Sequence, residues 1–426
     1  MDVKILPAPL GGSVSSIPSK SQAHRALICA ALADKPTSLD CSVSSKDIEC
    51  TIACLSALGA KIRRRQGGYD MRPLKRDRRF GSDPLPCGES GSTFRFLLPI
   101  AAVLRKKASF VPEGRLPERP LSPLYEELIR HGCALSPQGS VPFNIEGKLA
   151  PGLYTLDAGI SSQFISGLLF ALPLLDGDSE LRLTGRIESL PYIELTLVML
   201  ETFGISIEFK DMSFLVPGGQ TYRSPGNVKV EGDWSNAAFW LSAGAISSSG
   251  VTCTGLDLQS RQGDREITGI LTKFGARVEI CGSSVTVSRG ELRGIEIDAR
   301  HVPDLVPVLA VLAAIADGAT VIRNAGRLRG KESDRLASVT NVLCRLGADV
   351  RETEDGLLIH GGTPLTGGDV SSWGDHRIAM AAAIAATVCS EPVLIRDAEA
   401  VDKSYPGFFD DLRLLGGMAE CMKGGG

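Results

Sequence analysis

Apolar residues recur along the chain in two helical patterns and one strand pattern. In the first, polar positions separate the apolar ones, as in KESDRLASVTNVLCRLG from Lys331, which predicts an amphipathic helix. In the second, almost every position is apolar, as in LVPVLAVLAAIA from Leu305, which predicts a helix buried on all sides. In the third, alternation around Gly282, as in VEICGSSVTVSRG, predicts a strand hairpin. We therefore expect an α/β protein whose apolar helices lie inside, covered by amphipathic helices and sheets.

A glycine ends each amphipathic pattern and is followed by a short strand pattern. The motif reads LGAKI, HGCAL, FGISI, FGARV, LGADV and LGGMA, with glycines Gly59, Gly132, Gly204, Gly275, Gly347 and Gly416. Successive glycines are 73, 72, 71, 72 and 69 residues apart. Glycine commonly closes a helix because it adopts the left-handed conformation without strain. So regular a period indicates six repeats of about 71 residues.

Each repeat also contains one strongly apolar helix, and each of these helices begins with polar residues. The polar starts are marked by Ser21, Ser92, Ser162, Ser235, Asp304 and His376. A buried polar group without a partner costs several kcal/mol. We therefore expect the polar starts to surface together in a cleft, although repetition alone also fits separate outer faces.

The two ends of the chain indicate how the repeats form domains. The sixth repeat has no returning strand after LGGMAECMKGGG, whereas the N-terminal DVKILPAP is a strand pattern without a preceding helix. We therefore expect residues 1–19 to complete the sixth repeat. This predicts a discontinuous domain, 1–19 plus 231–426, and a continuous domain, 20–230, with three repeats each and a hinge near 19–20 and 228–231.

Composition and charge argue against several classes of protein. With a formal net charge of −3, we expect no nucleic acid partner. The longest apolar run, 305–316, is too short to span a bilayer and no signal-peptide pattern opens the chain, so we expect a cytoplasmic protein without a membrane partner. The five histidines lack ligand spacing, so we expect no metal site. We also expect a monomer.

The polar starts and nearby loops are rich in cations. The basic residues are Lys20, Arg25, Arg95, Arg119, Lys331, Arg335, Arg377 and Lys403. Neutral donors and acids accompany them, namely Ser21, Ser161, Ser162, Gln163, Asp304, Glu332 and Asp375. Arg and Lys recognise phosphate and carboxylate groups, and the acids are candidates for proton transfer. The mixture predicts a small substrate with several anionic groups, and without a Walker or GxGxxG motif a nucleotide is not the obvious anion.

The segment GDHRIAM, from Gly374, has two interpretations. Arg377 stands at the start of an apolar helix, where the helix dipole is already positive. Either Arg377 forms a surface ion pair with Asp375, or a bound anion lies there and attracts both the dipole and the arginine.

The motifs SKSQAHRAL, GESGSTFR, ERPL, SSQF, SLPYIELT, VPD, GKESDR, GDHRIAMA and DKSYPGFF occur in an order that resembles the EPSP synthase family of enolpyruvyl transferases. The resemblance covers the whole chain. It implies a fold of two inverse α/β barrels with three repeats each. It also implies an enzyme that transfers the enolpyruvyl group of phosphoenolpyruvate to the 5-hydroxyl of shikimate 3-phosphate. Phosphate would be released through a tetrahedral intermediate, without a cofactor, in aromatic amino acid biosynthesis.

The resemblance also implies residue roles. For shikimate 3-phosphate the implied ligands are Ser21, Arg25, Ser161, Ser162, Gln163, Ser189, Asp304 and Lys331. For phosphoenolpyruvate they are Lys20, Gly91, Arg119, Gln163, Arg335, Arg377 and Lys403. Asp304 is the expected base, Glu332 the expected acid, and Lys20 an assisting group. The herbicide glyphosate is expected to compete with phosphoenolpyruvate.

Simpler roles remain open for several of these residues. Asp304 could be a helix cap, and Glu332 and Arg335 could be a surface pair on one helix face. Three further residues, His24, Arg95 and His376, could pack, brace a loop or orient neighbours rather than contact a ligand.

The chain departs from the common family pattern at Glu89, Ser92, Leu190 and Arg327, where Asn, Thr, Lys and Asn are usual. One rival interpretation is the sister transferase that acts on a UDP-amino sugar, but Gly114 stands where that enzyme usually has cysteine. Another is an anion-binding repeat protein without catalysis, against which the candidate acid and base groups argue.

Overall fold

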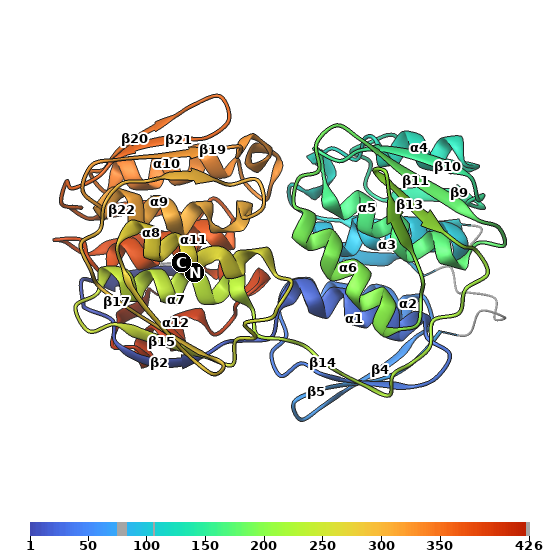
Figure 1. Ribbon diagram of the computed structural model, residues 1–426, viewed down its shortest axis with the longest axis horizontal. Helices are drawn as coiled ribbons and strands as arrows, with labels where there is room; N and C mark the ends of the chain where they lie inside the picture. Colours follow the sequence, from blue (N-terminus) through green and yellow to red (C-terminus); the bar gives the residue numbers. More distant parts are fainter. Residues whose placement is uncertain (75–82, 105–106, 423–426) are drawn as a thin grey trace. The chain divides into compact units, whose positions relative to one another are not determined.

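The computed structural model describes residues 1–74, 83–104 and 107–422, and the chain divides into two compact units (Figure 1). Unit 1 consists of Met1–Ser19 and Glu231–Gly426, and unit 2 of Lys20–Val230. Each unit has its own buried apolar core. Among the described residues, no helix is both long and apolar enough to cross a membrane.

The six four-stranded sheets share one topology. In each, the first two strands are parallel and the remaining neighbours are antiparallel. In unit 2 the orders are β14 (Asn227–Lys229), β3 (Thr37–Asp40), β5 (Gly68–Arg72), β4 (Lys61–Arg65); β6 (Leu85–Gly88), β7 (Lys107–Pro112), β9 (Phe143–Gly147), β8 (Cys133–Leu135); and β10 (Leu153–Asp157), β11 (Ser179–Thr184), β13 (Ser213–Val216), β12 (Glu208–Lys210). In unit 1 they are β2 (Gly12–Ser15), β15 (Val251–Thr254), β17 (Ser284–Ser288), β16 (Arg277–Cys281); β18 (Glu296–Asp298), β19 (Ala319–Arg323), β21 (Leu357–His360), β20 (Asp349–Glu352); and β22 (Gly368–Ser371), β23 (Val393–Arg396), β1 (Asp2–Leu6), β24 (Met418–Met422).

The N-terminal segment serves two sheets, which corrects part of the expectation for residues 1–19. Strand β1 completes the sheet of the sixth repeat, as expected, and pairs with β23 and β24. Strand β2 instead pairs in parallel with β15, in the fourth repeat. The reason is that every repeat needs a parallel strand beside the one that follows its buried helix. In unit 2 the same position in the first sheet is filled by β14, from the end of that unit.

One apolar helix lies inside each repeat and one amphipathic helix covers it. The inner helices are α1 (Lys20–Leu32), α3 (Gly91–Leu104), α5 (Ser162–Ala171), α7 (Trp234–Ile246), α9 (Val306–Ile315) and α11 (His376–Ala386). The outer helices are α2 (Lys46–Ala57), α4 (Leu124–Arg130), α6 (Leu190–Thr202), α8 (Ile267–Phe274), α10 (Arg335–Arg345) and α12 (Phe408–Leu414). Every residue of α7 and α11 is buried, as their apolar sequences predict.

The six glycines that define the repeat all adopt the left-handed conformation. Their φ angles are 106° at Gly59, 99° at Gly132, 74° at Gly204, 100° at Gly275, 92° at Gly347 and 94° at Gly416. An L side chain is strained in this region, so glycine recurs at each helix end for a conformational reason.

Candidate active site

The expected site residues form two groups, one in each unit. In unit 1, the guanidinium of Arg335, at the first position of α10, is 2% exposed and meets three carboxylates. Its Nη1 lies 2.7 Å from Asp304, its Nη2 2.8 Å from Glu332 and its Nε 2.8 Å from Asp375. Burial alone would lower the pKa of Arg335, but the carboxylates of Asp375, Glu332 and Asp304 raise it above its ordinary value. Arg335 is therefore a permanent cation that anchors three acids.

Arg377 is held by Asp304 rather than by Asp375. Its Nη2 lies 2.9 Å from Asp304 Oδ2, and its Nη1 donates to the Asp304 carbonyl at 3.2 Å. Asp375 caps α11 by accepting the backbone N–H of Arg377 at 2.9 Å. Because Arg377 and Asp375 are both buried, the surface ion pair offered as one interpretation is wrong.

Two simpler roles considered for the acids are also wrong. Asp304 lies inside the short helix η4 (Pro303–Leu305) with its carboxylate on two arginines, so it is not a mere helix cap. Glu332 precedes α10, whose cap is Asp334, so Glu332 and Arg335 do not share a helix face. Their pair is not a surface pair either, because Arg335 is buried.

The electrostatic environment separates the ionisable groups of unit 1. Burial raises the pKa of Asp304, but Arg377, Arg335 and Lys331 outweigh it and hold that pKa well below its usual range. Burial lowers the pKa of Lys331 to about 8. Burial, with the nearby Asp304 charge, raises the pKa of Asp264 to about 7, and Ser235 donates a hydrogen bond to this carboxyl group. Asp304 is thus a carboxylate, whereas Lys331 and Asp264 change charge closer to neutral pH.

In unit 2, the first two turns of α1 carry two expected ligands, Lys20 and Arg25, with well-defined partners. Lys20 Nζ lies 2.8 Å from Asp47, in the first turn of α2. Arg25 is buried and donates to Thr196 Oγ1 at 2.8 Å and to the carbonyls of Ser21 and Tyr192 at 2.6 and 2.7 Å. These bonds fix the guanidinium against α6.

The start of α5 forms a second cluster. Ser161 caps this helix by accepting the N–H of Gln163, and Ser162 is its first residue. The Gln163 amide donates to Ser92 Oγ at 2.9 Å and accepts from Arg95 at 2.9 Å. Arg95 therefore braces Gln163, which agrees with the simpler of its two roles and fixes which way the amide points.

The loop before α3 packs closely on its neighbours. A Cβ atom at Gly91 would lie 2.9 Å from Arg119 Nη1, so the bare backbone leaves room for that guanidinium. A Cβ atom at Gly114 would lie 2.6 Å from the Glu89 carboxyl carbon, so Gly114 accommodates the departure at Glu89. Ser189 is buried and occupies the N-cap position of α6 in the left-handed conformation, with a φ angle of 55°.

The chain resembles known proteins over nearly its whole length. A model of the EPSP synthase family (3-phosphoshikimate 1-carboxyvinyltransferase) matches residues 6–412. The chain belongs to the EPSP synthase family. The 3-phosphoshikimate 1-carboxyvinyltransferase of Clostridium kluyveri is 44% identical over 418 residues, covering 97% of each chain. That of Clostridium acetobutylicum is 45% identical over 420 residues, with the same coverage.

Solved structures agree with the expected fold. EPSP synthase from Acinetobacter baumannii superposes with a TM-score of 0.83 at 25% identity, covering 99% of this chain and all of that chain, 100%. The enolpyruvyl transferase NikO from Streptomyces tendae has a TM-score of 0.79 at 19% identity and covers 98% of both chains, which bears on the fold alone. The expected two-domain α/β fold is confirmed, and so is enolpyruvyl transfer in aromatic amino acid biosynthesis. Neither rival interpretation fits a family member with these relatives.

Within this EPSP synthase family fold, sequence reasoning missed several partners of the expected residues. Asp47 pairs with Lys20 across 27 positions of sequence, and Thr196 binds Arg25 across 171. No local pattern signals such pairs, because each depends on how two helices pack. Asp375 did carry a signal, the cap position before an apolar helix, but its contact with Arg335 is also long-range.

Unit 1 also contains Lys403, His376 and Arg327. Lys403 Nζ donates to the Gly374 carbonyl at 2.7 Å, beside the start of α11. His376 is buried with Nδ1 3.7 Å from Asp375 Oδ1, and Arg327 donates to the Arg300 carbonyl.

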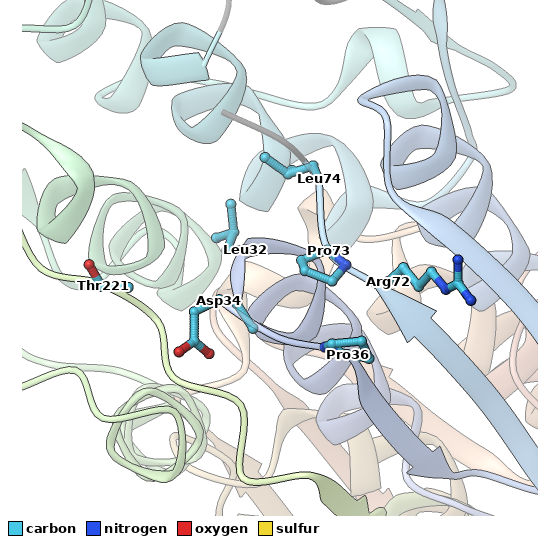
Figure 2. A pocket seen from close by; sticks show the side chains of 8 residues that line it. Leu32, Asp34, Pro36, Arg72, Pro73, Leu74 and Thr221 are labelled. Carbon is cyan, nitrogen blue, oxygen red and sulfur yellow. The ribbon is translucent and has the colours of Figure 1, made fainter. Parts of the chain in front are cut away.

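One pocket in unit 2 is unrelated to the expected residues. It has a volume of about 500 Å³ and is lined by Leu32, Ala33, Asp34, Pro36, Arg72, Pro73, Leu74 and Thr221 (Figure 2). None of the residues that the EPSP synthase resemblance implies lies among them. In the described part of the chain, no cluster of three or more His, Cys, Asp or Glu residues is placed to hold a metal ion.

Proposed function

We propose that the two groups of residues carry out the transfer from phosphoenolpyruvate to shikimate 3-phosphate. For shikimate 3-phosphate, the proposed ligands in unit 2 are Ser21, Arg25, Ser161, Ser162, Gln163 and Ser189, and in unit 1 Lys331 and Asp304. For phosphoenolpyruvate, Lys20, Gly91, Arg119 and Gln163 act in unit 2, and Arg335, Arg377 and Lys403 in unit 1. Support comes from the charge of these residues, which suits two substrates with phosphate and carboxylate groups.

In the proposed addition step, Asp304 takes the proton of the 5-hydroxyl as its oxygen bonds to C2 of phosphoenolpyruvate. Glu332, in its protonated form and assisted by Lys20, gives a proton to the methylene carbon, which becomes a methyl group and leaves Glu332 as a carboxylate. In the elimination step, the Glu332 carboxylate takes a proton back from that methyl group, and the C2–O bond to phosphate breaks. The proton that Asp304 took from the hydroxyl passes to the departing phosphate, which restores the Asp304 carboxylate. The products are the enolpyruvyl ether and inorganic phosphate, so atoms and charge balance.

The observation that carries this proposal is that Arg335 and Arg377 both form ion pairs with the carboxylate of Asp304. Paired with two guanidinium groups, Asp304 is too weak a base to accept a hydroxyl proton readily. Anionic phosphoenolpyruvate competes for the same two arginines. We therefore propose that its binding loosens their hold and raises the basicity of Asp304 only when both substrates are present.

A direct assay tests the function. Purified protein should release inorganic phosphate only when both shikimate 3-phosphate and phosphoenolpyruvate are supplied. Release with a UDP-amino sugar in place of shikimate 3-phosphate, or no release at all, would contradict the proposal. We further propose a cytoplasmic monomer with a hinge near 19–20 and 228–231, which size-exclusion chromatography with light scattering tests for the oligomeric state.

A further inference from the structure

Four buried polar side chains in unit 2 form a continuous chain of hydrogen bonds across three helices. His24 Nδ1 on α1 lies 2.7 Å from Thr51 Oγ1 on α2, and Thr51 Oγ1 lies 2.6 Å from Thr93 Oγ1 on α3. Thr93 in turn donates to Ser90 Oγ at 2.7 Å. All four residues are at most 1% exposed. Burying a polar group without a hydrogen bond costs free energy, so each of these side chains is expected to keep its hydrogen-bond partner.

The direction of every proton in this chain follows from one rule, that a hydroxyl has a single hydrogen. Ser90 Oγ accepts from both the backbone N–H and the hydroxyl of Thr93. The Thr93 hydroxyl also reaches the Asp47 carbonyl at 3.4 Å, but Ser90 Oγ at 2.7 Å is the nearer acceptor and takes the single hydrogen. The Thr93 oxygen therefore accepts from Thr51. With its hydrogen on Thr93, the Thr51 oxygen must accept from His24, which therefore carries its proton on Nδ1.

The surroundings of His24 fit this assignment. Burial, together with the positive charges of Lys20 and Arg25, holds the pKa of His24 well below its ordinary value, so the ring is neutral. Its Nε2 has no hydrogen-bond partner among the described residues. In the Nδ1–H form this atom is an acceptor, so no buried N–H group is left without a partner.

The chain of hydrogen bonds ends at Ser90, in the loop before α3, which lies next to expected phosphoenolpyruvate ligands. Ser90 immediately precedes Gly91, which packs on Arg119, and Ser92 binds Gln163. At the other end, His24 lies one helical turn from Lys20 on α1, and Thr51 one turn from Asp47 on α2. The hydrogen bonds therefore connect the N-terminal halves of α1, α2 and α3 from inside.

We propose that His24, Thr51, Thr93 and Ser90 are positioning residues: a one-directional hydrogen-bond chain that locks the starts of α1, α2 and α3 together and so presents Lys20 and Gly91 to phosphoenolpyruvate. The inference rests on the proposed function. None of the four residues needs to touch a substrate. They act by fixing the residues that do.

Steady-state kinetics of Thr51→Val and Thr93→Val test the role. Valine keeps the shape of threonine but breaks the chain, so we expect the KM for phosphoenolpyruvate to rise about tenfold or more, with the KM for shikimate 3-phosphate within about twofold. Thr51→Ser keeps the hydroxyl and should restore the wild-type KM. Thr37→Val is the matched control, because it removes a buried hydroxyl bonded to Ser224 at 2.7 Å elsewhere in unit 2. An unchanged phosphoenolpyruvate KM in both valine variants, or a serine variant as impaired as Thr51→Val, overturns the proposal.

A second measurement needs no variant and no turnover. With only five histidines, selective ¹⁵N labelling resolves the His24 ring by NMR. We expect a neutral, Nδ1-protonated ring that does not titrate between pH 6 and pH 8, and an Nε2–H ring or a titrating ring overturns the direction of the chain. If the wild-type protein releases no phosphate, the proposed function fails while this spectrum still reports on the hydrogen bonds. If turnover is normal but the valine variants behave as wild type, only the positioning role fails.

Discussion

At the scale of single residues, Arg335 determines the charge arrangement of unit 1. Arg335 forms ion pairs with three carboxylates, those of Asp304, Glu332 and Asp375. Two further cations, Arg377 and Lys331, lie near Asp304. Burying charges costs several kcal/mol per ion unless they are paired, so each carboxylate depends on its cation. In the proposed mechanism, substrate anions would disturb this balance and so change the basicity of the proposed proton-transfer groups.

Removing either of the two proposed proton-transfer groups, Asp304 or Glu332, should lower turnover strongly. Asp304→Asn and Glu332→Gln keep the shape of the side chain but cannot exchange the proton, so we expect kcat to fall by about 10² or more. Phosphate-release assays at saturating substrates measure this. Glu291→Gln, an exposed acid paired with Arg293 in the same unit, serves as the control. Near-normal turnover in either variant would show that the residue is only structural.

Lys331 should impose an alkaline limit on substrate capture. With a pKa of about 8, lowered chiefly by burial, it is neutral above that pH in the free enzyme and cannot pair with a phosphate group. We expect kcat/KM for shikimate 3-phosphate to fall about tenfold per pH unit above this value. Lys331→Arg stays charged throughout and should abolish the decline. A decline that persists in the arginine variant would assign it to another group.

Single residues also show where sequence reasoning ends. The sequence offered Asp375 or a bound anion as the partner of Arg377, yet the acid that pairs with it is Asp304, 73 positions away, and the bound anion stays a prediction. Asp47 beside Lys20 was not foreseen. The sequence shows the cations Arg377 and Lys20 at helix starts, whereas their pairing with Asp304 and Asp47 depends on helix packing that no local pattern encodes.

At the scale of secondary-structure elements, the repeat was predictable because its signals are local. Helix-ending glycines and apolar periodicity each depend on a few neighbouring residues, and all six glycines are left-handed. The placement of β2 and β14 was not predictable. Each strand directly precedes the inner helix of the other unit in sequence, but pairs within its own unit. Which sheet takes such a strand is decided by tertiary packing.

The start of α3 gives a prediction at this scale. In Gly91→Ala the new methyl group would meet the Arg119 guanidinium at 2.9 Å and displace it. We expect the inhibition constant of glyphosate to rise more than the KM for phosphoenolpyruvate, by about 10- to 100-fold, because a larger ligand tolerates a tightened site less well. Gly269→Ala, on α8 with open space around its Cβ position, is the control. An equal change in both constants would mean that the start of α3 does not line the proposed phosphoenolpyruvate site.

At the scale of the whole molecule, the two units differ in what they need from the rest of the chain. Unit 2 is continuous, and residues 20–230 contain every strand of its three sheets. Unit 1 depends on the N-terminal segment, because the buried Val3 and Ile5 of β1 lie between β23 and β24, and β2 lies beside β15. The segment also pairs with the crossing near Glu231, where Ser19 N–H donates to the Glu231 carbonyl at 2.8 Å.

This difference predicts which fragments fold. Residues 20–230 alone should give a cooperative thermal unfolding transition by circular dichroism, whereas residues 231–426 alone should not, because β23 and β24 lose their shared partner and become open edges. A permutant that runs from residue 231 to 426 and continues directly into residues 1–19 should recover the transition. Asp2 is already paired with Met422, so the new connection between these two residues needs only the length of a hairpin loop. Cooperative unfolding of residues 231–426 without the N-terminal segment would contradict this prediction, and so would a permutant without a cooperative transition. Either result would show that the folding of unit 1 does not depend on strands β1 and β2.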